Sequence, residues 1–429
     1  MLSQSLDKQE TKPGESSDNI FQKPHTATLL VIFLGVILFL AWRSEERSDT
    51  VSNVIRGVLC SCIPLLVYGT LQFRDGFFQR PHPAVWRLVM GISLVYLMFL
   101  VFLLFQNVSD ARKIMGYLDP IYAGRPLPDR SYGEDCRLWT PENPNGSWVN
   151  LTSALDAFVV AHTLGWFVKA LIIRDRVVLW LASAFFELLE YFLKGMLPNF
   201  NECWWDSIIL DLFCCNLIGI EVGLVACKAL QTKKYLWRGD DSISKRRFWR
   251  EMLNSLLPSS FDRLHWPIVG SFRHFIACSL VIFVLEVADL NAFFLKAILW
   301  VQVESPLNVY RILIIALQGF PSAREFYQFL IDASCQRFGS QAWILVATLT
   351  AELFICVKFG RHVYRKNWRE YFPRHVRYWV TALAAGYLVF ALLIAVIDWR
   401  CHLCNLNTKA RDDKQCIKTG TGHQPHCMT

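Results

Sequence analysis

Nucleotide-binding loops are missing from this 429-residue sequence, which has neither a G-x-x-x-x-G-K-[ST] phosphate-binding loop nor a G-x-G-x-x-G dinucleotide fingerprint. Charged residues are scarce, at 19% of the chain. The first 24 residues are polar and lack the pattern of a removable signal peptide. These absences argue against ATP-driven and nicotinamide-dependent chemistry, and they predict that the first hydrophobic segment is an uncleaved anchor.

Hydrophobic residues are what the sequence has in excess. They make up 53% of the chain, and 31 Phe and 16 Trp contribute to an aromatic content of 14%, which excludes an ordinary soluble enzyme. We expect an all-α, polytopic membrane protein with roughly ten transmembrane helices. Clear apolar stretches occur at about 26–42, 57–73, 88–105, 177–197, 207–228, 342–357 and 378–398, and more polar candidates at about 154–173, 275–301 and 308–320.

Basic residues lie in the loops between these stretches, so the net charge of +8 reflects membrane topology and indicates no nucleic-acid partner. The basic loop after Lys228 is expected in the cytoplasm, which places the N-terminus in the cytoplasm and the 106–154 connection in the lumen. The predicted organisation is a cytoplasmic tail (1–24), a multi-span catalytic domain (25–400) with its site region at 156–228, and a C-terminal tail (401–429).

The 275–301 stretch is ambiguous, because it could form one tilted helix or two short arms around Asp289 and Asn291. The choice decides the side of the basic 358–377 loop. Positive charge predicts a cytoplasmic position for this loop, which requires an even number of crossings between the two basic loops. A single long helix at 275–301 would break that rule.

The C-terminal tail contains four Cys and three His residues, but their spacing matches no regular zinc motif. We therefore expect a disordered tail rather than a metal centre. Cysteines within the apolar stretches are expected to act as small hydrophobic residues. Cys136 and Cys203 differ from these, because they fall in the predicted lumenal segments.

Five carboxylates are concentrated between residues 187 and 211, against one basic residue, Lys194. A charged side chain deep in a transmembrane helix costs about 2.5 to 3.5 kcal/mol on insertion scales. Such residues therefore normally face a partner, a cavity or an ion. The five are Glu187, Glu190, Glu202, Asp206 and Asp211.

These acids are expected to converge. Glu187 and Glu190 would share one helix face, and the short turn at 197–206 should bring the helix that carries Asp211 against them. Oxygen ligands without a paired His or Cys favour a hard divalent cation, and a lumenal position favours calcium. The alternative is that the acids pair with basic residues or reach water at the ends of their spans. The predicted Ca²⁺ ligands are Glu187, Glu190, Glu202 and Asp211.

His162 lies inside the preceding apolar stretch. A lone His on an apolar helix is usually a hydrogen-bonded packing residue, but a short hairpin should place His162 at the membrane level of Glu190. An imidazole beside a cation site is a candidate general base. Asn216, about one and a half helical turns beyond Asp211, would orient a ligand or bond between helices. The predicted catalytic residues are His162, Asp206 and Asn216.

Weaker candidates lie elsewhere. Basic side chains near two loops would hold a lipid phosphate or cap the membrane interface; these are Arg80, His82 and Arg324. Three further intramembrane acids form no visible cluster, and we expect them to pair between helices; these are Glu286, Asp289 and Glu352.

Asp75-Gly-Phe-Phe-Gln-Arg80 resembles the opening of the motif in enzymes that transfer phosphatidyl groups from CDP-activated lipids. The motif requires a Gly and two Asp further along, where this sequence has Val89, Ser93 and Leu97. The chain therefore does not carry the signature of that family.

Several segments together resemble the base-exchange phosphatidylserine synthases, over about residues 20 to 400. The run Pro-Asn-Phe-x-Glu-Cys-Trp-Trp-Asp is the most specific of them. The segments are RPHPAVWR (80–87), AHTLGW (161–166), LPNFNECWWD (197–206), Asp211 with Cys215-Asn216, and DLNAFFLK (289–296).

The resemblance implies an endoplasmic reticulum enzyme that exchanges the head group of phosphatidylcholine or phosphatidylethanolamine for L-serine, with calcium and no nucleotide. It implies a feedback-regulatory role for Arg80 and His82. Segment 132–136 and the residues around Arg324 resemble the ethanolamine-exchanging type two enzymes. A homodimer is one possible assembly. The family's essential residues correspond to His162, Glu187, Glu190, Asn199, Glu202, Asp206, Asp211 and Asn216.

Our mechanistic hypothesis is that His162 removes the serine hydroxyl proton while carboxylate-bound calcium neutralises the phosphate oxygens. Direct attack of serine on the phosphate and a route through a phosphatidyl-His162 intermediate are both compatible with these residues. A membrane-bound O-acyltransferase is one rival, but it needs no cluster of five carboxylates. An ion-coupled transporter is another, but it predicts inverted repeats, and the 156–228 region has no second copy.

Overall fold

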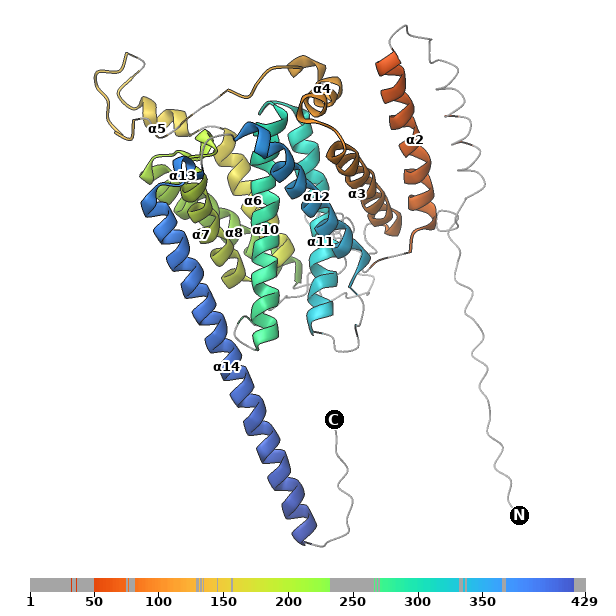
Figure 1. Ribbon diagram of the computed structural model, residues 1–429, viewed down its shortest axis with the longest axis vertical. Helices are drawn as coiled ribbons and strands as arrows, with labels where there is room; N and C mark the ends of the chain where they lie inside the picture. The colour runs from red at the N-terminus through yellow and green to blue at the C-terminus, as the bar shows by residue number, and fades with distance from the viewer. Residues whose placement is uncertain are drawn as a thin grey trace, which may run out of the picture.

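The computed structural model describes residues 50–231, 266, 268 and 271–419, plus two isolated positions before residue 50, with short gaps at 75, 77–81, 129–130, 132, 134, 145, 156, 332–334, 336–337 and 365–367. Within these residues the regular structure is entirely helical. The helices run in alternating directions and pack side by side as a bundle (Figure 1). The expected all-α class is thus confirmed, while the predicted first span (26–42) and the N-terminal tail lie outside the described residues.

Long helices coincide with the expected apolar stretches. Five of them, at 83–104, 206–229, 272–299, 340–363 and 374–401, are long and apolar enough to cross a membrane; the count of ten stays a prediction. The helices are α2 (Thr50–Gln72), α3 (Pro83–Leu104), α4 (Val108–Leu118), α5 (Val149–Ala154), α6 (Ala157–Ile173), α7 (Arg176–Leu193), η4 (Asp206–Asn216), α8 (Leu217–Gln231), α10 (Phe272–Leu299), α11 (Pro306–Ile331), α12 (Ser340–Val363), α13 (Trp368–Tyr371) and α14 (Arg374–Thr419), with short 3₁₀ turns η2 (Pro120–Tyr122) and η3 (Pro198–Phe200).

α6 and α8 form the closest helix pair, because two glycines on α8 leave room for the α6 backbone. A Cβ atom on Gly219 would press against the backbone of Thr163, and one on Gly223 would lie 2.6 Å from the Cβ of Ala170. The Gly-x-x-x-Gly spacing therefore lets the two helices approach at backbone distance, as small residues do in membrane bundles.

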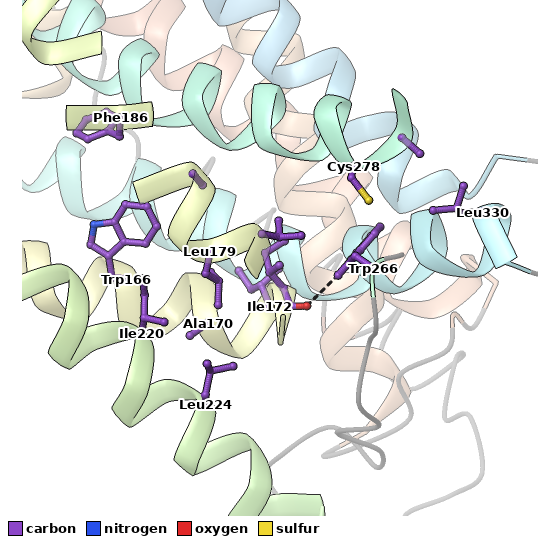
Figure 2. Packing of buried hydrophobic residues seen from close by; sticks show 14 residues of the cluster. Trp166, Ala170, Ile172, Leu179, Phe186, Ile220, Leu224, Trp266, Cys278 and Leu330 are labelled. Carbon is purple, nitrogen blue, oxygen red and sulfur yellow. Dashed lines mark hydrogen bonds between the residues drawn. The ribbon is translucent and has the colours of Figure 1, made fainter. Parts of the chain in front are cut away.

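An apolar cluster continues from this contact into α7, α10 and α11 (Figure 2). Ile220 of α8 packs against Trp166 of α6, both almost fully buried. At the far side of the cluster, the indole of Trp266 donates a hydrogen bond of 3.1 Å to the carbonyl oxygen of Ile173. This packing fixes α6, α7 and α8 relative to one another, and these three helices carry most of the predicted site.

α10 is one uninterrupted helix of 28 residues, so the interpretation as two short arms is wrong. Two of its central polar side chains bond to neighbouring helices: Asp289 pairs with Lys169, and Asn291 donates to the carbonyl oxygen of Leu349. A helix that satisfies its polar groups laterally has no reason to break.

The prediction that both basic loops lie on one side is consequently wrong, since three helices separate them. Lys358 donates to the carbonyl oxygens of Leu104 and Gln106 at the end of α3, which is where the 106–154 connection begins. Likewise, a Cβ atom on Gly195, just after α7, would collide with the backbone of Tyr371 in α13. We call this end of the bundle, with α4, α5, α13 and the turn 194–205, the site end.

α14 reaches beyond the rest of the bundle at the opposite end (Figure 1). It packs on α10, where Phe275 stacks on Tyr387 with ring centroids 5.5 Å apart. Its helical backbone continues to Thr419, so residues 401–419 differ from the disorder expected of the tail. Residues 420–429, and the tail Cys and His side chains beyond Cys401, lie outside the described part.

Candidate active site

The helix that carries Asp206, Asp211 and Asn216 begins as a π-helix, η4. Hydrogen bonds in a π-helix join residue i to residue i+5, so side chains five positions apart return to nearly the same side. In an α-helix, with 3.6 residues per turn, the same three positions would diverge around the axis. The π-helical geometry therefore brings Asp206 closer to Asp211, and Asp211 closer to Asn216, around the axis than an α-helix would.

Asn216 connects this face to α7. It is fully buried, and its Nδ2 atom donates to Ser183 Oγ at 2.9 Å and to Glu187 Oε1 at 3.0 Å. The predicted antiparallel contact between the two helices is thus present. Asn216 does bond between helices, but it does so by orienting a predicted ligand, Glu187.

The predicted carboxylates come together at the site end. Glu202 lies near Asp211, Asp206 and Glu187, and Glu190 lies near Glu202 and Glu187. The carboxyl groups of Glu202 and Asp211 lie within interaction distance of each other. Burial and these negative neighbours raise the pKa of Glu202, which lies in the turn before η4, to about 9. The cluster is therefore short of positive charge.

Three oxygen atoms in this cluster have no hydrogen-bond partner among the described residues, although they are shielded from solvent: Glu187 Oε2, Glu190 Oε2 and Asn216 Oδ1. Unsatisfied buried acceptors are costly, and carboxylate and amide oxygens are the ligands that calcium prefers. The donor set thus fits a hard cation. In the part of the chain that the structure describes, no three His, Cys, Asp or Glu side chains already surround one metal position, so the carboxylates would have to turn toward a common point to bind it.

Positive charge near the cluster comes from α6. Lys169 pairs with Asp289 at 2.5 Å and lies over the ring of Trp166, 3.8 Å from its centroid. Lys194, the basic residue that the sequence placed among the acids, instead lies over the ring of Tyr191. The sequence-based prediction missed Lys169, although it lies two helical turns after His162 and so on the same face. It also missed Ser183.

His162 is half-buried on α6 and lies beside Asn216. Its Nε2 atom accepts a hydrogen bond of 3.3 Å from the indole Nε1 of Trp166. Because an indole N–H only donates, Nε2 carries the lone pair and the proton of the neutral ring lies on Nδ1. The imidazole therefore has an acceptor nitrogen next to the carboxylate cluster, as the general-base hypothesis requires.

A disulfide bond, which the sequence analysis did not assign, holds the turn that lies over the site. Cys136 and Cys203 are joined across 67 residues. The indole of Trp205 donates to the carbonyl oxygen of Cys136 at 3.2 Å, and Asn201 donates to Ser131 at 2.9 Å. The 131–137 segment thus pins the turn that contains Glu202.

The predicted lipid-contacting residues do not gather at the site. Asn199 lies in η3 at the site end, where it lines a cavity. His82 is the N-cap of α3, with Nδ1 accepting from the backbone N–H of Ala84 at 3.1 Å, and Arg324 lies near the last turns of α11, both toward the opposite end. Arg80 lies outside the described residues.

The three other intramembrane acids differ in whether they form an ion pair. Asp289 pairs with Lys169, and Glu352 pairs with Arg311, as expected. Glu286 is buried and its Oε2 atom has no partner within the described chain, so the prediction of inter-helix pairing is wrong for this residue. Glu286 instead faces the same region as Asp289 and Glu187.

Comparison with known proteins agrees with this geometry. A family model described as phosphatidyl serine synthase matches residues 81–360, which contain every helix of the site. The chain belongs to the phosphatidylserine synthase family. This family member is 38% identical to phosphatidylserine synthase 2 of Homo sapiens over 350 residues, covering 81% of the chain and 72% of the human protein.

Plant relatives are equally similar. A protein of Oryza sativa subsp. japonica named CDP-diacylglycerol--serine O-phosphatidyltransferase 2 is 38% identical over 391 residues, covering 89% of this chain and 90% of the rice protein. An Arabidopsis thaliana protein, named as type 1 of the same transferase, is also 38% identical, with 88% of each chain covered. The names of these relatives agree on serine and a phosphatidyl group, and only the plant names specify a phosphatidyl donor, CDP-diacylglycerol.

Proposed function

We propose that this protein exchanges the head group of a phospholipid for L-serine, making phosphatidylserine in the endoplasmic reticulum membrane, with calcium and without a nucleotide. The observation that carries the proposal is the acceptor nitrogen of His162 beside buried carboxylates that lack partners in the described chain. Exchange of one phosphodiester for another is nearly balanced in energy, so positioning and charge stabilisation suffice.

The roles of the residues follow from the atoms they present. His162 Nε2 takes the proton of the serine hydroxyl, which replaces the long and therefore weak bond from Trp166. The serine oxygen then bonds to phosphorus while the bond to the leaving head-group oxygen breaks. Protonated His162 returns its proton to that oxygen, so the base is regenerated.

Asn216 and Ser183 position the acids for this reaction. Asn216 holds Glu187 Oε1 and leaves Oε2 available to a ligand. Glu187, Glu190 and Asn216 supply the unpartnered oxygens for Ca²⁺, and Asp211 and Glu202 lie next to them. When bound, calcium would neutralise negative charge on the phosphate as phosphorus becomes five-coordinate.

Phosphatidylethanolamine is the donor we propose first, with phosphatidylcholine as the second, because segment 132–136 and the residues around Arg324 resemble the ethanolamine-exchanging type two enzymes. A CDP-activated donor is the competing function, and the names of the plant relatives favour it. The chain lacks the Gly and two Asp of the CDP-dependent motif at Val89, Ser93 and Leu97, which supports base exchange.

The test is incorporation of labelled L-serine into lipid by the purified full chain in liposomes. Phosphatidylethanolamine, phosphatidylcholine and CDP-diacylglycerol are offered separately, each with calcium or with a chelator. We expect calcium-dependent incorporation from a phospholipid donor and release of its free head group. Incorporation from CDP-diacylglycerol alone, with release of CMP, would replace base exchange by the competing function.

A further inference from the structure

A cavity of about 280 Å³ opens at the site end, between the turn after α7 and the last turns of α10. Its walls include three aromatic rings, those of Phe293, Trp300 and Tyr364, and the side chain of Asn199. Among the described residues that line the cavity, Lys296 is the charged one. A mostly apolar hollow with a single cation and an amide is the usual form of a site for a small anionic ligand.

Lys296 differs from the other partly buried lysines of the bundle. Lys169 pairs with Asp289, and Lys358 donates to two carbonyl oxygens at the end of α3. Within the described residues Lys296 has no carboxylate or hydrogen-bond partner, and its Nζ atom lies over the ring of Phe293, 4.5 Å from the ring centroid. A cation withdrawn from water needs an anion, and here the described chain does not provide it.

The volume limits what that anion belongs to. A cavity of about 280 Å³ lies at the small end of the range for ligand sites, roughly 300 to 1,000 Å³, so it suits an amino acid better than a lipid with two acyl chains. A phosphodiester carries the same single negative charge as a carboxylate, so the charge of one Lys suits either group. The size of the cavity is what favours the amino acid over the lipid. The Asn199 amide can take the second carboxylate oxygen or the amino group.

The cavity adjoins the carboxylate site. Asn199 lies in the turn between Glu190 and Glu202, and Phe200 of that turn packs on Phe293 with centroids 4.8 Å apart. Phe186, one residue before Glu187, contacts both of these rings. A ligand anchored at Lys296 would therefore lie against the wall that the cavity shares with the reacting groups.

We propose that this cavity binds the acceptor amino acid, with Lys296 holding the α-carboxylate of L-serine. The inference rests on the proposed function for the identity of the ligand. It makes Lys296 a binding residue that selects serine over head-group alcohols without a carboxylate, such as ethanolamine. It also explains how a lipid exchange site can favour an amino acid at the water-facing end of the bundle.

The test compares two acceptors on the full chain in liposomes of phosphatidylethanolamine: labelled L-serine and labelled ethanolamine, which is serine without the carboxylate. In Lys296→Met we expect the KM for serine to rise roughly 10- to 100-fold, as for loss of a hydrogen bond to a charged group, while the KM for ethanolamine stays the same. Lys113→Met is the matched control, because Lys113 lies exposed on α4 at the same end, and it should change neither constant.

The outcomes separate the two proposals. Equal loss of both acceptors in a Lys296→Met protein that unfolds normally would assign the cavity to the lipid phosphate and overturn the inference. If the wild-type protein exchanges neither acceptor, the proposed function fails. An equilibrium binding measurement then tests independently whether the cavity binds serine. If the wild-type protein binds L-serine but not serinol, and Lys296→Met loses this binding, the assignment of the cavity to serine stands. Equal binding of L-serine by the wild type and by Lys296→Met would overturn that assignment.

Discussion

Two buried carboxylate groups of this bundle have opposite surroundings. Glu352 of α12 is fully buried and saturated: Arg311 binds it through two nitrogens, and Tyr96 and Asn291 donate to it at 2.6 and 3.1 Å. Glu190 of α7 is also buried, but one of its oxygens has no partner in the described chain and its nearest charged neighbours are acids.

The comparison distinguishes an acid that the protein itself satisfies from one that we propose to be functional. Both residues lose the hydration of a carboxyl group, and only Glu352 regains equivalent interactions within the protein. For Glu187 and Glu190 the equivalent stabilisation would have to come from a bound ligand. Pairing, rather than burial or position in an apolar helix, is therefore the criterion that locates the site.

The sharpest test of this contrast is His162, which belongs to the unsaturated region. His162→Ala should lower serine incorporation by about 10² to 10⁴-fold, the usual contribution of a general base, with little change in thermal unfolding. His274→Ala is the matched control, since His274 bonds to Ser271 at the opposite end of the bundle. Retained activity in His162→Ala would remove the general-base role.

Glu352→Gln should behave in the opposite way. Breaking a buried ion pair costs about 3 to 5 kcal/mol, because Arg311 keeps its charge without a full partner. We expect a large drop in unfolding free energy in detergent, whereas Glu187→Gln should leave stability unchanged and abolish activity. Comparable destabilisation by the two variants would show that the contrast between the two acids has no energetic basis.

The disulfide adds a second structural element to the site. Cys136→Ser should reduce stability by about 2 to 4 kcal/mol and weaken activity, because the turn with Glu202 loses its anchor. Cys214→Ser is the control, since Cys214 is a free, exposed cysteine on η4. Unfolding curves with and without reductant measure the effect, and a reductant response in Cys136→Ser equal to that of the wild type would contradict it.

Calcium should stabilise the folded protein only by binding to the carboxylates that lack partners in the described chain. At a hundred times its Kd a ligand adds about 2.7 kcal/mol of stability, so the wild type should unfold at a higher temperature with calcium than with a chelator. The shift should vanish in Glu190→Gln and persist in Tyr96→Phe, which alters the saturated region. A shift that survives in Glu190→Gln would move the cation elsewhere.

The smallest effect is expected at Ser183. Ser183→Ala removes one acceptor of Asn216 and should cost about 0.5 to 1.5 kcal/mol, with a modest fall in activity because Asn216 also positions Glu187. Ser93→Ala removes a buried hydroxyl that donates to the carbonyl oxygen of Val89 at 2.9 Å in the other region, and it should affect stability alone. Steady-state kinetics and unfolding of both variants separate the two effects.

Much of the site could be predicted from the sequence, since apolar length identifies membrane helices and clustered acids in them are costly enough to require a function. Glu187 and Glu190 were predicted in this way, and His162 and Asn216 were predicted from their expected positions beside these acids. Lys169 was missed because sequence spacing alone does not tell whether a cation on one helix meets an acid on another. The predicted side of the 358–377 loop was wrong because α10 is one continuous helix, so that three helices separate the two basic loops; charge counting cannot detect this.

The sequence by itself determined the helical membrane class, the family and the set of acids, because these depend on composition and on contiguous motifs. Tertiary structure decided which acids are neutralised, because pairing depends on neighbours more than a hundred residues away, as for Lys169 and Asp289. It also decided how Asp206, Asp211 and Asn216 meet. Their spacing of five suits a π-helix and not an α-helix, and the contacts of Asn216 with α7 accompany that geometry.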